Sequence, residues 1–346
     1  MSTTRTVGIG LVGCGTIGPL HARAVAGIEG ARLVAVADLR RERSEKLAAE
    51  HGVTACSSMD ELLGTPGVDL VSICTPSGTH GELGAQAARA GRHVVVEKPV
   101  DTTMQAARDL VEACHKAGVV LSVISQHRFD PGTQRLKATL DAGGLGRVLL
   151  AEGRVWWYRS QGYYDAGSWR GTYAQDGGAL MNQASHYVDL LDWLIGPIES
   201  LHAYTATLAR DIEVEDTAVM NLKWRSGALG SMNVTMLTYP KNLEGSITLL
   251  GEKGSVRIGG VAVNEIQHWE FAESHPDDDR IKDANYQTTS VYGFGHPLYY
   301  DNVLQVLRGE AEPETDGREG LKSLEVLIAA YISARDGRRV SLPLDY

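Results

Sequence analysis

The chain has 346 residues, 43% of them hydrophobic and 22% charged, so it can form two globular domains that each bury a core. Its formal net charge of -10 is scattered rather than clustered, which argues against nucleic acid as a partner, and no apolar run approaches the ~20 residues that span a bilayer. Four cysteines without CxxC spacing predict neither a disulfide framework nor a metal site, and they fit a cytoplasmic protein.

The first third of the chain alternates short apolar runs with helical patterns. The expected strands cover 7–13, 32–38, 69–75, 93–99 and 119–125, and the expected helices cover 17–28, 41–51, 81–90 and 103–117. Such alternation predicts a doubly wound parallel sheet with helices on both faces. Strands that are apolar throughout fit a sheet covered on both sides. We therefore expect an α/β protein whose residues 1–125 form a Rossmann domain.

The pattern changes after residue 125. A helix is expected over 131–142, ending at Gly143 and Gly144, and another over 320–334. Between them, alternating or aromatic-rich runs predict strands over 147–158, 200–209, 217–224, 228–237, 245–251 and 255–263. Residues 126–346 are thus expected to form an α+β domain with a large, mostly antiparallel open sheet.

A glycine-rich turn follows the first expected strand. Gly13, Gly15 and Gly18 form a G-x-G-x-x-G motif, with Thr16 and Ile17 inside it. The first glycine permits a tight turn, the second lets the backbone approach a pyrophosphate, and the third lets helix and strand pack closely. The helix N-terminus then offers N–H groups and a positive dipole to the phosphates. The motif predicts that this turn binds a dinucleotide.

An acidic residue ends the second expected strand, where a ribose-binding acid is expected. Asp38 lies 20 positions after Gly18, and Leu39 follows it. A carboxylate there binds ribose hydroxyls and repels a 2′-phosphate, which favours NAD over NADP. Arg40 and Arg41 leave the alternative open, because either could bind a 2′-phosphate.

Three further segments carry a family resemblance. They are Thr75 and Pro76 with His80, then the tripeptide EKP at 97–99, and the run GGALMNQASH at 177–186. With the glycine turn they resemble, in order and spacing over nearly the whole chain, the glucose-fructose oxidoreductase and inositol dehydrogenase family (Gfo/Idh/MocA). The resemblance implies an NAD-dependent dehydrogenase that acts on a CH–OH group.

The resemblance also implies roles for single residues. In the family the E-K-P lysine reaches the nicotinamide and the reacting carbon, and a histidine of the second domain acts as acid and base; these roles fall to Lys98 and His186. The implied cofactor contacts are Gly13, Gly15, Thr16, Ile17, Gly18, Asp38, Leu39, Thr75, Pro76, His80, Glu97, Lys98 and Gln126. The Lys98–Pro99 bond is cis in the family, and the sequence leaves its form open.

Physical chemistry supports both catalytic roles. Lys98 ends an expected parallel strand, at the sheet edge where ligands bind in such folds. Histidine suits the removal of a hydroxyl proton as hydride leaves carbon, and an ammonium group can stabilise the developing alkoxide.

Asn182 departs from the family pattern, because an acid is common at this place in a D-x-x-x-H motif. Asn182 and His186 are four positions apart, so their side chains lie on one helix face. An amide cannot take a proton. We therefore expect Asn182 to hydrogen-bond a substrate hydroxyl, and the missing carboxylate removes repulsion toward an anionic substrate.

Segments 156–173, 177–194 and 290–303 resemble the branch of this family that oxidises UDP-N-acetylglucosaminuronic acid at C-3 of the sugar, a step toward bacterial surface polysaccharides. Arginines there can pair with a carboxylate or diphosphate, and aromatic rings can stack on sugar or uracil. The expected substrate contacts are Lys98, Arg128, Arg159, Tyr163, Tyr164, Trp169, Arg170, Asn182, Gln183, His186, His296 and Tyr300.

Two other functions stay open at this point. The first is an NAD(P)-dependent dehydrogenase of a free sugar or cyclitol, and the second is a non-catalytic cofactor-binding regulator. Retention of both Lys98 and His186 argues against the regulator, and the sequence does not choose the direction of the reaction. We expect a homo-oligomer, a dimer or tetramer, because the apolar face of an open sheet must be covered.

Overall fold

A computed structural model describes residues 6–273, 278–288 and 290–345. By its contacts the chain divides into two compact units. The first unit contains Met1–Ile124 and His296–Leu321, and the second contains Ser125–Gly295 and Lys322–Tyr346. The chain thus returns to the first unit for 26 residues (296 to 321 inclusive) after most of the second unit is complete.

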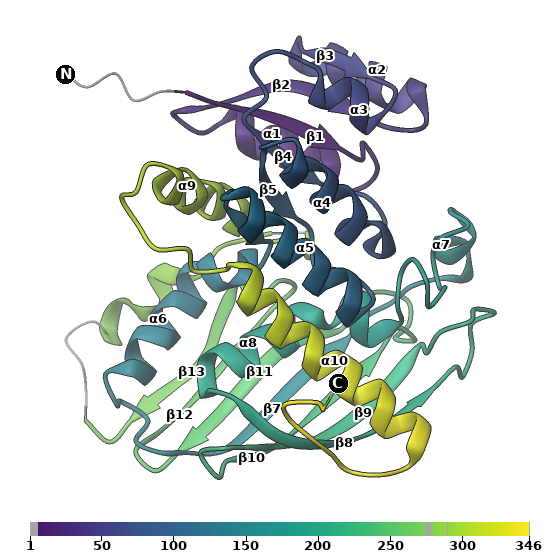
Figure 1. Cartoon of the computed structure of the whole chain (residues 1–346). Coiled ribbons are helices and arrows are strands. Elements are labelled where there is room, and N and C mark those ends of the chain that lie inside the picture. The colour runs from purple at the N-terminus through teal and green to yellow at the C-terminus, as the bar shows by residue number, and fades with distance from the viewer. Residues whose placement is uncertain (1–5, 274–277, 289, 346) are drawn as a thin grey trace. The chain divides into compact units, whose positions relative to one another are not determined.

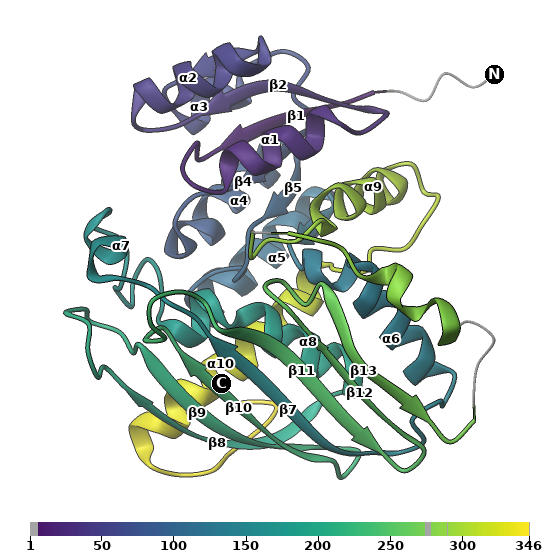
Figure 2. The same ribbon diagram turned by 180° about the vertical axis from the view of Figure 1, so that it is seen from behind.

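The first unit is built on a parallel sheet of six strands in the order β3-β2-β1-β4-β5-β6. The strands are β1 (Val7–Val12), β2 (Ala31–Ala37), β3 (Thr54–Cys56), β4 (Leu70–Ile73), β5 (His93–Val96) and β6 (Leu121–Val123). The helices are α1 (Gly18–Ala26), α2 (Arg41–His51), α3 (Met59–Leu63), α4 (His80–Arg89), α5 (Met104–Ala117) and α9 (Gly295–Leu307), with the 3-10 turn η1 (Ser77–Thr79). In Figures 1 and 2, α1 and α2 lie on one face of the sheet and α4 and α5 on the other. The predicted doubly wound parallel sheet is confirmed.

Local sequence explains where these elements begin and end. The side chain of Thr103 accepts a hydrogen bond from the backbone N–H of Ala106, which caps the start of α5. Gly118 ends the same helix in the left-handed conformation that glycine adopts without strain. The strand order reverses between β1 and β4, so the loops after these two strands diverge and leave room for a ligand at the carboxyl edge.

The second unit is built on a sheet of eight strands in the order β13-β12-β11-β7-β10-β9-β8-β14. The strands are β7 (Val148–Trp156), β8 (Ile198–Ala206), β9 (Thr217–Trp224), β10 (Leu229–Thr235), β11 (Glu244–Gly251), β12 (Gly254–Gly259), β13 (Glu265–Phe271) and β14 (Val340–Ser341). Only β7 and β10 pair in parallel among these described strands. The predicted mostly antiparallel sheet is therefore confirmed, with β13 and β14 added to the strands that the sequence predicted.

Helices cover one face of this sheet. They are α6 (Pro131–Asp141), α8 (Ser185–Ile195) and the second-unit part of α10 (Gly317–Asp336), seen in front of the sheet in Figure 1 and behind it in Figure 2. The shorter elements are η2 (Gln126–Phe129), α7 (Gln161–Asp165), the π-helical turn η3 (Ala179–Gln183) and η4 (Asp278–Ala284). Along β9, Ala218, Met220 and Leu222 are buried, while the intervening side chains face outward. This alternation is expected of a sheet with one covered face.

No helix among the described residues is long and apolar enough to cross a membrane. Helix α9 was not predicted, because Gly293, Gly295 and Pro297 at its start are typical of a turn.

Candidate active site

The glycine turn after β1 has the shape that a pyrophosphate requires. Gly13 has a φ of 97°, and a β-carbon on it would lie 2.5 Å from the carbonyl oxygen of Cys74. A β-carbon on Gly18 would lie 2.2 Å from the carbonyl oxygen of Gly13, so only glycine lets α1 start this close to β1. A β-carbon on Gly15 would meet nothing nearer than Nη1 of Arg43, at 3.8 Å. The first and third glycines serve packing, and the second leaves open backbone that a ligand can approach.

The helix after the turn starts at an apolar N-cap residue. Ile17 is the N-cap of α1 and makes no side-chain cap hydrogen bond, and Thr16 precedes it. Pro19 has no N–H and that of Leu20 donates to the carbonyl oxygen of Ile17, so the backbone N–H groups before Pro19 and the positive dipole are what suit a phosphate. Turn and helix together fit the pyrophosphate of a dinucleotide.

Asp38 lies at the end of β2 beside the glycine turn. Its Oδ2 accepts a hydrogen bond from the backbone N–H of Cys14, and its Oδ1 accepts one from the backbone N–H of Arg40, both at 2.8 Å. The Leu39 side chain is 94% exposed. Arg41 is exposed and paired with Glu45 at 2.7 Å. The guanidinium of Arg43, which the sequence analysis did not single out, reaches the glycine turn, with Nη1 3.8 Å from the position of a β-carbon on Gly15.

The loops after β4 and β5 are joined by one buried histidine. His80 Nε2 lies 2.9 Å from the carbonyl oxygen of Thr75, and Nδ1 lies 2.8 Å from that of Pro99. The Lys98–Pro99 bond is cis, and Pro76 begins the turn η1 before His80. Thr75, Pro76, His80 and Lys98 thus gather at the carboxyl edge of the parallel sheet.

Glu97 is held from both sides directly before Lys98. Its Oε2 accepts a hydrogen bond from the backbone N–H of Lys98 at 3.0 Å, and its Oε1 lies 2.9 Å from Nε2 of His21 on α1. Burial alone would raise the pKa of Glu97, but the hydrogen bond and charge of His21 hold this pKa at about 2. The pair fixes the backbone at Lys98 from inside the unit.

His296 and Tyr300, both on α9, lie in the interior of the first unit and are 1% and 0% exposed. The hydroxyl of Tyr300 is 2.7 Å from Nδ1 of His21 and 2.8 Å from Oγ of Ser72. His296 stacks edge-to-face on His21, with ring centroids 5.1 Å apart, and its Nε2 is 4.0 Å from Glu97. Both predicted substrate contacts therefore belong to the buried network behind Glu97.

His186 lies at the start of α8, in the second unit. The π-helical turn η3 leads into α8, and the His186 ring is 8% exposed. Its Nε2 is 3.3 Å from Nε2 of Gln126, whose Oε1 has no hydrogen-bond partner among the described residues. A π-helical turn is often found at functional sites.

Three consecutive residues of η2 contact the same helix. Gln126 reaches His186, the ring of His127 packs on that of His186, and Arg128 binds Asp189 one turn later. The Arg128 guanidinium is bidentate, at 2.8 and 2.6 Å, and 2% exposed. This arginine, predicted to bind substrate, fastens η2 to α8 through a buried ion pair.

Asn182 is held by a carboxylate of the preceding loop. Its amide Nδ2 donates to Oδ1 of Asp176, and Oδ2 of Asp176 accepts from the backbone N–H of Gly171 at 2.7 Å. The neutral side chain at 182 therefore has a local carboxylate partner.

Five of the predicted substrate residues gather near η3. Arg159 donates to Oε1 of Gln183 at 2.8 Å, and Gln183 donates to the hydroxyl of Tyr163 at 3.1 Å. The Tyr163 ring also contacts two guanidinium groups, with Arg159 at 5.4 Å and Arg170 at 4.1 Å from its centroid. Arg170 lies 4.5 Å from the ring centroid of Trp169. Arg159 also donates to the carbonyl oxygen of Tyr158 at 2.8 Å and to Oδ1 of Asn242 at 3.2 Å.

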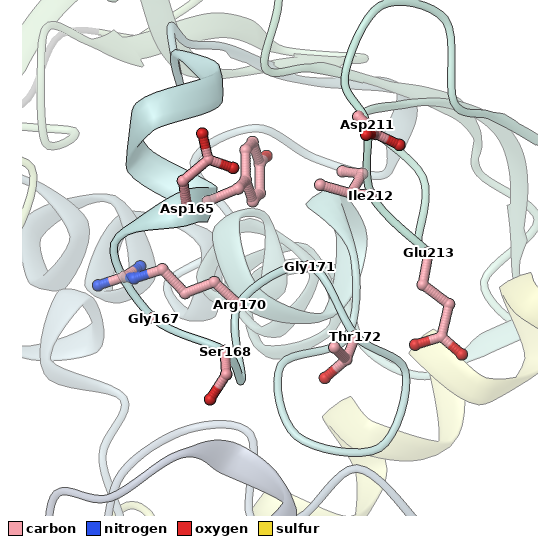
Figure 3. Close-up of a pocket in the computed structure, with 10 residues that line it drawn as sticks. Asp165, Gly167, Ser168, Arg170, Gly171, Thr172, Asp211, Ile212 and Glu213 are labelled. Carbon is pink, nitrogen blue, oxygen red and sulfur yellow. The ribbon is translucent and has the colours of Figure 1, made fainter.

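A cavity of about 400 Å³ lies beside this cluster (Figure 3). Buried Tyr164 lines it with Asp165, Asp211, Glu213 and Arg170, whose guanidinium points away from Asp211 and Glu213 in Figure 3. Three carboxylates against one guanidinium would repel a polyanion. The cavity is therefore not the expected place for an acidic nucleotide sugar.

Sequence reasoning missed several buried polar residues of the site, among them His21, His127, Asp130 and Glu215. Their partners are far away in sequence, so no local motif marks them. A polar residue in an otherwise apolar segment, such as His21 in α1, was the available signal.

Fold and site define the class of protein, a two-domain oxidoreductase that uses a dinucleotide. Family models for the two domains match, one described as "Oxidoreductase family, NAD-binding Rossmann fold" over residues 7–125 and the other as "Oxidoreductase family, C-terminal alpha/beta domain" over 137–342. The chain belongs to the Gfo/Idh/MocA oxidoreductase family, and its N-terminal domain is an NAD-binding Rossmann fold.

Similar proteins include dehydrogenases of known structure. The WlbA dehydrogenase from Bordetella pertussis, solved with NADH and UDP-GlcNAcA, is 56% identical, with a TM-score of 0.96 and full coverage of both chains. The WlbA dehydrogenase from Chromobacterium violaceum, solved with the same two ligands, is also 56% identical, with a TM-score of 0.94 over 99% of this chain and 98% of the other. The scyllo-inositol 2-dehydrogenase (NAD(+)) of Bacillus subtilis is 29% identical over 96% of this chain and 95% of its own.

Proposed function

We propose that this protein oxidises the 3-hydroxyl of the sugar in a UDP-N-acetylhexosaminuronic acid, with NAD as the hydride acceptor, in bacterial surface polysaccharide biosynthesis. The observation that carries the proposal is 56% identity, over the full length of both chains, to a dehydrogenase solved with NADH and UDP-GlcNAcA. Two inositol dehydrogenases that align over 96% of this chain are about half as similar, at 29% and 27% identity, so a cyclitol substrate is the second candidate.

The cofactor half of the site is assigned to the first unit. The backbone at Gly13, Gly15 and Gly18 suits the pyrophosphate, and Asp38 suits the adenosine ribose. The sheet edge at Thr75, Pro76, His80, Glu97 and Lys98 suits the nicotinamide end, and the open side of Gly15 supports the assignment. When bound, NAD accepts the hydride.

The chemistry is assigned to two side chains. His186 takes the proton of the sugar hydroxyl at a ring nitrogen as the C–H bond breaks, and the carbon becomes a ketone. The ammonium group of Lys98 stabilises the negative charge that develops on the oxygen. The Glu97 carboxylate, which accepts a hydrogen bond from the backbone N–H of Lys98, holds the backbone there.

The acidic substrate is assigned to the cluster around Tyr163. Arg159 and Arg170 offer positive charge, while Tyr163, Trp169 and Gln183 offer stacking surface and hydrogen bonds. Asn182, the residue before Gln183, is neutral, and its amide is bound to the carboxylate of Asp176. A uronate carboxylate or a diphosphate fits these two guanidinium groups, whereas a neutral cyclitol has no need of them.

We also propose a cytoplasmic homo-oligomer in which a second copy covers the outer sheet face. Leu150 of β7 is paired across the sheet with Leu229 of β10 and Leu250 of β11, and all three are 40–55% exposed. An exposed apolar row across three adjacent strands is expected to be covered by another subunit.

A substrate panel tests the proposal. Purified protein is mixed with NAD and with UDP-N-acetylglucosaminuronic acid, UDP-N-acetylglucosamine, myo-inositol, scyllo-inositol or glucose, and reduced cofactor is followed by absorbance. We expect the acidic UDP-sugar to be used about 10- to 150-fold better than its neutral parent, the equivalent of ~1.5–3 kcal/mol for a charge-assisted hydrogen bond. Turnover of inositol or glucose with neither UDP-sugar would refute the assignment.

A further inference from the structure

A second histidine packs against the proposed base. The rings of His127 and His186 are edge-to-face, with centroids 4.9 Å apart and an interplanar angle of 87°. His127 is 2% exposed and His186 is 8% exposed, and they belong to different elements of the same unit, η2 and α8. The ring of His127 therefore forms one wall of the space that the base occupies.

A buried carboxylate fixes the ring of His127. Nδ1 of His127 lies 2.6 Å from Oδ2 of Asp130, and the hydroxyl of Tyr286 donates to Oδ1 of Asp130 at 3.0 Å. Thr133 donates to the carbonyl oxygens of both His127 and Asp130, which fixes the backbone between them. With both carboxylate oxygens bound, the plane of the His127 ring is set.

The side chain of Asp130 binds His127 and Tyr286 and does not cap the helix that follows it, α6. It is the N-cap residue of α6, where an aspartate normally accepts a backbone N–H bond, yet its side chain makes no such cap. The carboxylate is fully buried and turned toward His127 and Tyr286. A β-carbon on Gly293 would lie 3.2 Å from both carboxylate oxygens, so a glycine leaves room for them.

Packing alone does not account for the pair. An apolar side chain at 127 would fill the same space and would need no carboxylate beside it. Because burying a carboxylate costs free energy unless it is paired, packing alone would favour the apolar side chain. A histidine whose orientation is set by a carboxylate is instead the arrangement that orients imidazole groups in active sites. The D-x-x-x-H carboxylate of the family is absent here, because position 182 is an asparagine bound to Asp176.

We propose that His127 and Asp130 are positioning residues for His186: Asp130 fixes the ring of His127, and His127 together with Gln126 fixes the orientation of the base. The proposal rests on the role of His186 in the proposed function. As His186 takes a proton its ring becomes cationic, and the carboxylate behind His127 favours that cation. Other charged or titratable groups lie nearby: Arg128 follows His127 in η2 and binds Asp189 of α8, Tyr286 donates to Asp130, and Tyr187 of α8 interacts electrostatically with Asp130 and Glu244.

Two variants of His127 separate its ring from its hydrogen bond. His127→Asn keeps an N–H donor for Asp130 but removes the ring, and His127→Phe keeps a ring but removes the donor. We expect each to lower kcat on the order of 10- to 100-fold, short of the ~10⁴-fold loss of a triad whose orienting carboxylate is removed. The KM for NAD should change less than twofold. His268→Asn is the matched control, because His268 lies on the edge strand β13 of the second unit's sheet, where it hydrogen-bonds Ser255 of β12. This variant should keep normal kcat.

The His127 results decide the proposal. If one variant fails to fold, the other carries the comparison, and wild-type kcat in a folded variant would overturn the positioning role.

A measurement without substrate separates this proposal from the substrate assignment. The histidine ring signals of the free protein are titrated by NMR, and the signal of His186 is assigned as the one that is lost in His186→Ala. Asp130→Asn should lower the midpoint of the His186 titration by about half a pH unit or more, because a nearby anion is lost. An unchanged midpoint would contradict the proposal even if the UDP-sugar is not the substrate.

Discussion

At the scale of single residues, the proposed reaction depends on Lys98 and His186. Replacing either by alanine should lower kcat by ~10²–10⁴-fold, the usual contribution of a positioned acid, base or charged group. The affinity for NAD should survive in His186→Ala, because this residue is in the second unit and the glycine turn in the first. Stopped-flow NADH formation and fluorescence titration with NAD check both statements, and near-normal kcat in His186→Ala would move the base elsewhere.

Cofactor choice is also a property of single residues. Asp38→Ala should reduce the preference for NAD over NADP, because the carboxylate that repels a 2′-phosphate is lost. Arg43, whose guanidinium reaches the glycine turn, is then the cation best placed to meet that phosphate. Dissociation constants of both cofactors are measured, with Arg41→Ala as the control, since Arg41 is paired with Glu45 at the surface. An unaltered ratio in Asp38→Ala would show that another residue sets the preference.

Residue-level prediction from sequence worked where the reason is local. The glycine turn follows from backbone geometry within six residues, and its three glycines have the three predicted surroundings. The fate of Arg128 and Tyr300 depends on Asp189 and His21, partners 61 and 279 positions away. A single sequence does not reveal such distant partners. From the sequence alone, an arginine that pairs with a carboxylate inside the protein therefore looks the same as one that binds substrate.

At the scale of elements, the π-helical turn η3 depends on one buried acid. Oε1 of Glu215 accepts hydrogen bonds from the backbone N–H of Leu180 at 2.8 Å and from the hydroxyl of Tyr331 at 3.0 Å. Burial raises the pKa of Glu215 to about 7, and these hydrogen bonds offset that effect only in part. Glu215 is therefore mostly neutral in the folded protein below pH 7.

This gives a stability prediction with a definite sign. In the unfolded chain Glu215 ionises near its ordinary pKa of 4.5, so the folded protein binds more protons between about pH 4.5 and 7 and loses stability as the pH rises through that window. Glu215→Gln removes this loss. The variant should gain ~2.5 kcal/mol relative to wild type between pH 5 and pH 8. Urea unfolding at the two pH values checks it, and an equal pH dependence of both proteins would contradict it.

Most elements could be predicted because their periodicity is strong. The alternating strands and helices of the parallel sheet and most strands of the open sheet follow from apolar patterns. The turn η3 and helix α9 could not be predicted in this way. A π-helical turn has no sequence period of its own, and α9 begins with glycines and a proline that are typical of a loop. The return of residues 296–321 to the first unit is likewise a long-range property.

At the scale of the whole molecule, the outer face of the open sheet should bind a second copy. Leu150→Glu places a charge between Leu229 and Leu250 and should shift the protein toward monomer. The carboxylate is hydrated in the monomer, and dimerisation would have to bury it without a partner. Sedimentation velocity measures this, with Leu39→Glu as the control, since Leu39 is 94% exposed in the other unit. A wild-type protein that is monomeric at micromolar concentration would refute the oligomer.

Hydride transfer from C-3 of an acidic UDP-sugar to NAD can be followed with an isotope label. UDP-N-acetylglucosaminuronic acid that carries deuterium at C-3 is incubated with the protein and NAD, and the cofactor is analysed by mass spectrometry. We expect reduced cofactor one mass unit heavier than with unlabelled sugar, formed at least ~10²-fold more slowly with His186→Ala. Reduced cofactor without the label would place the oxidation at another carbon, and no reduced cofactor at all would contradict the assigned substrate.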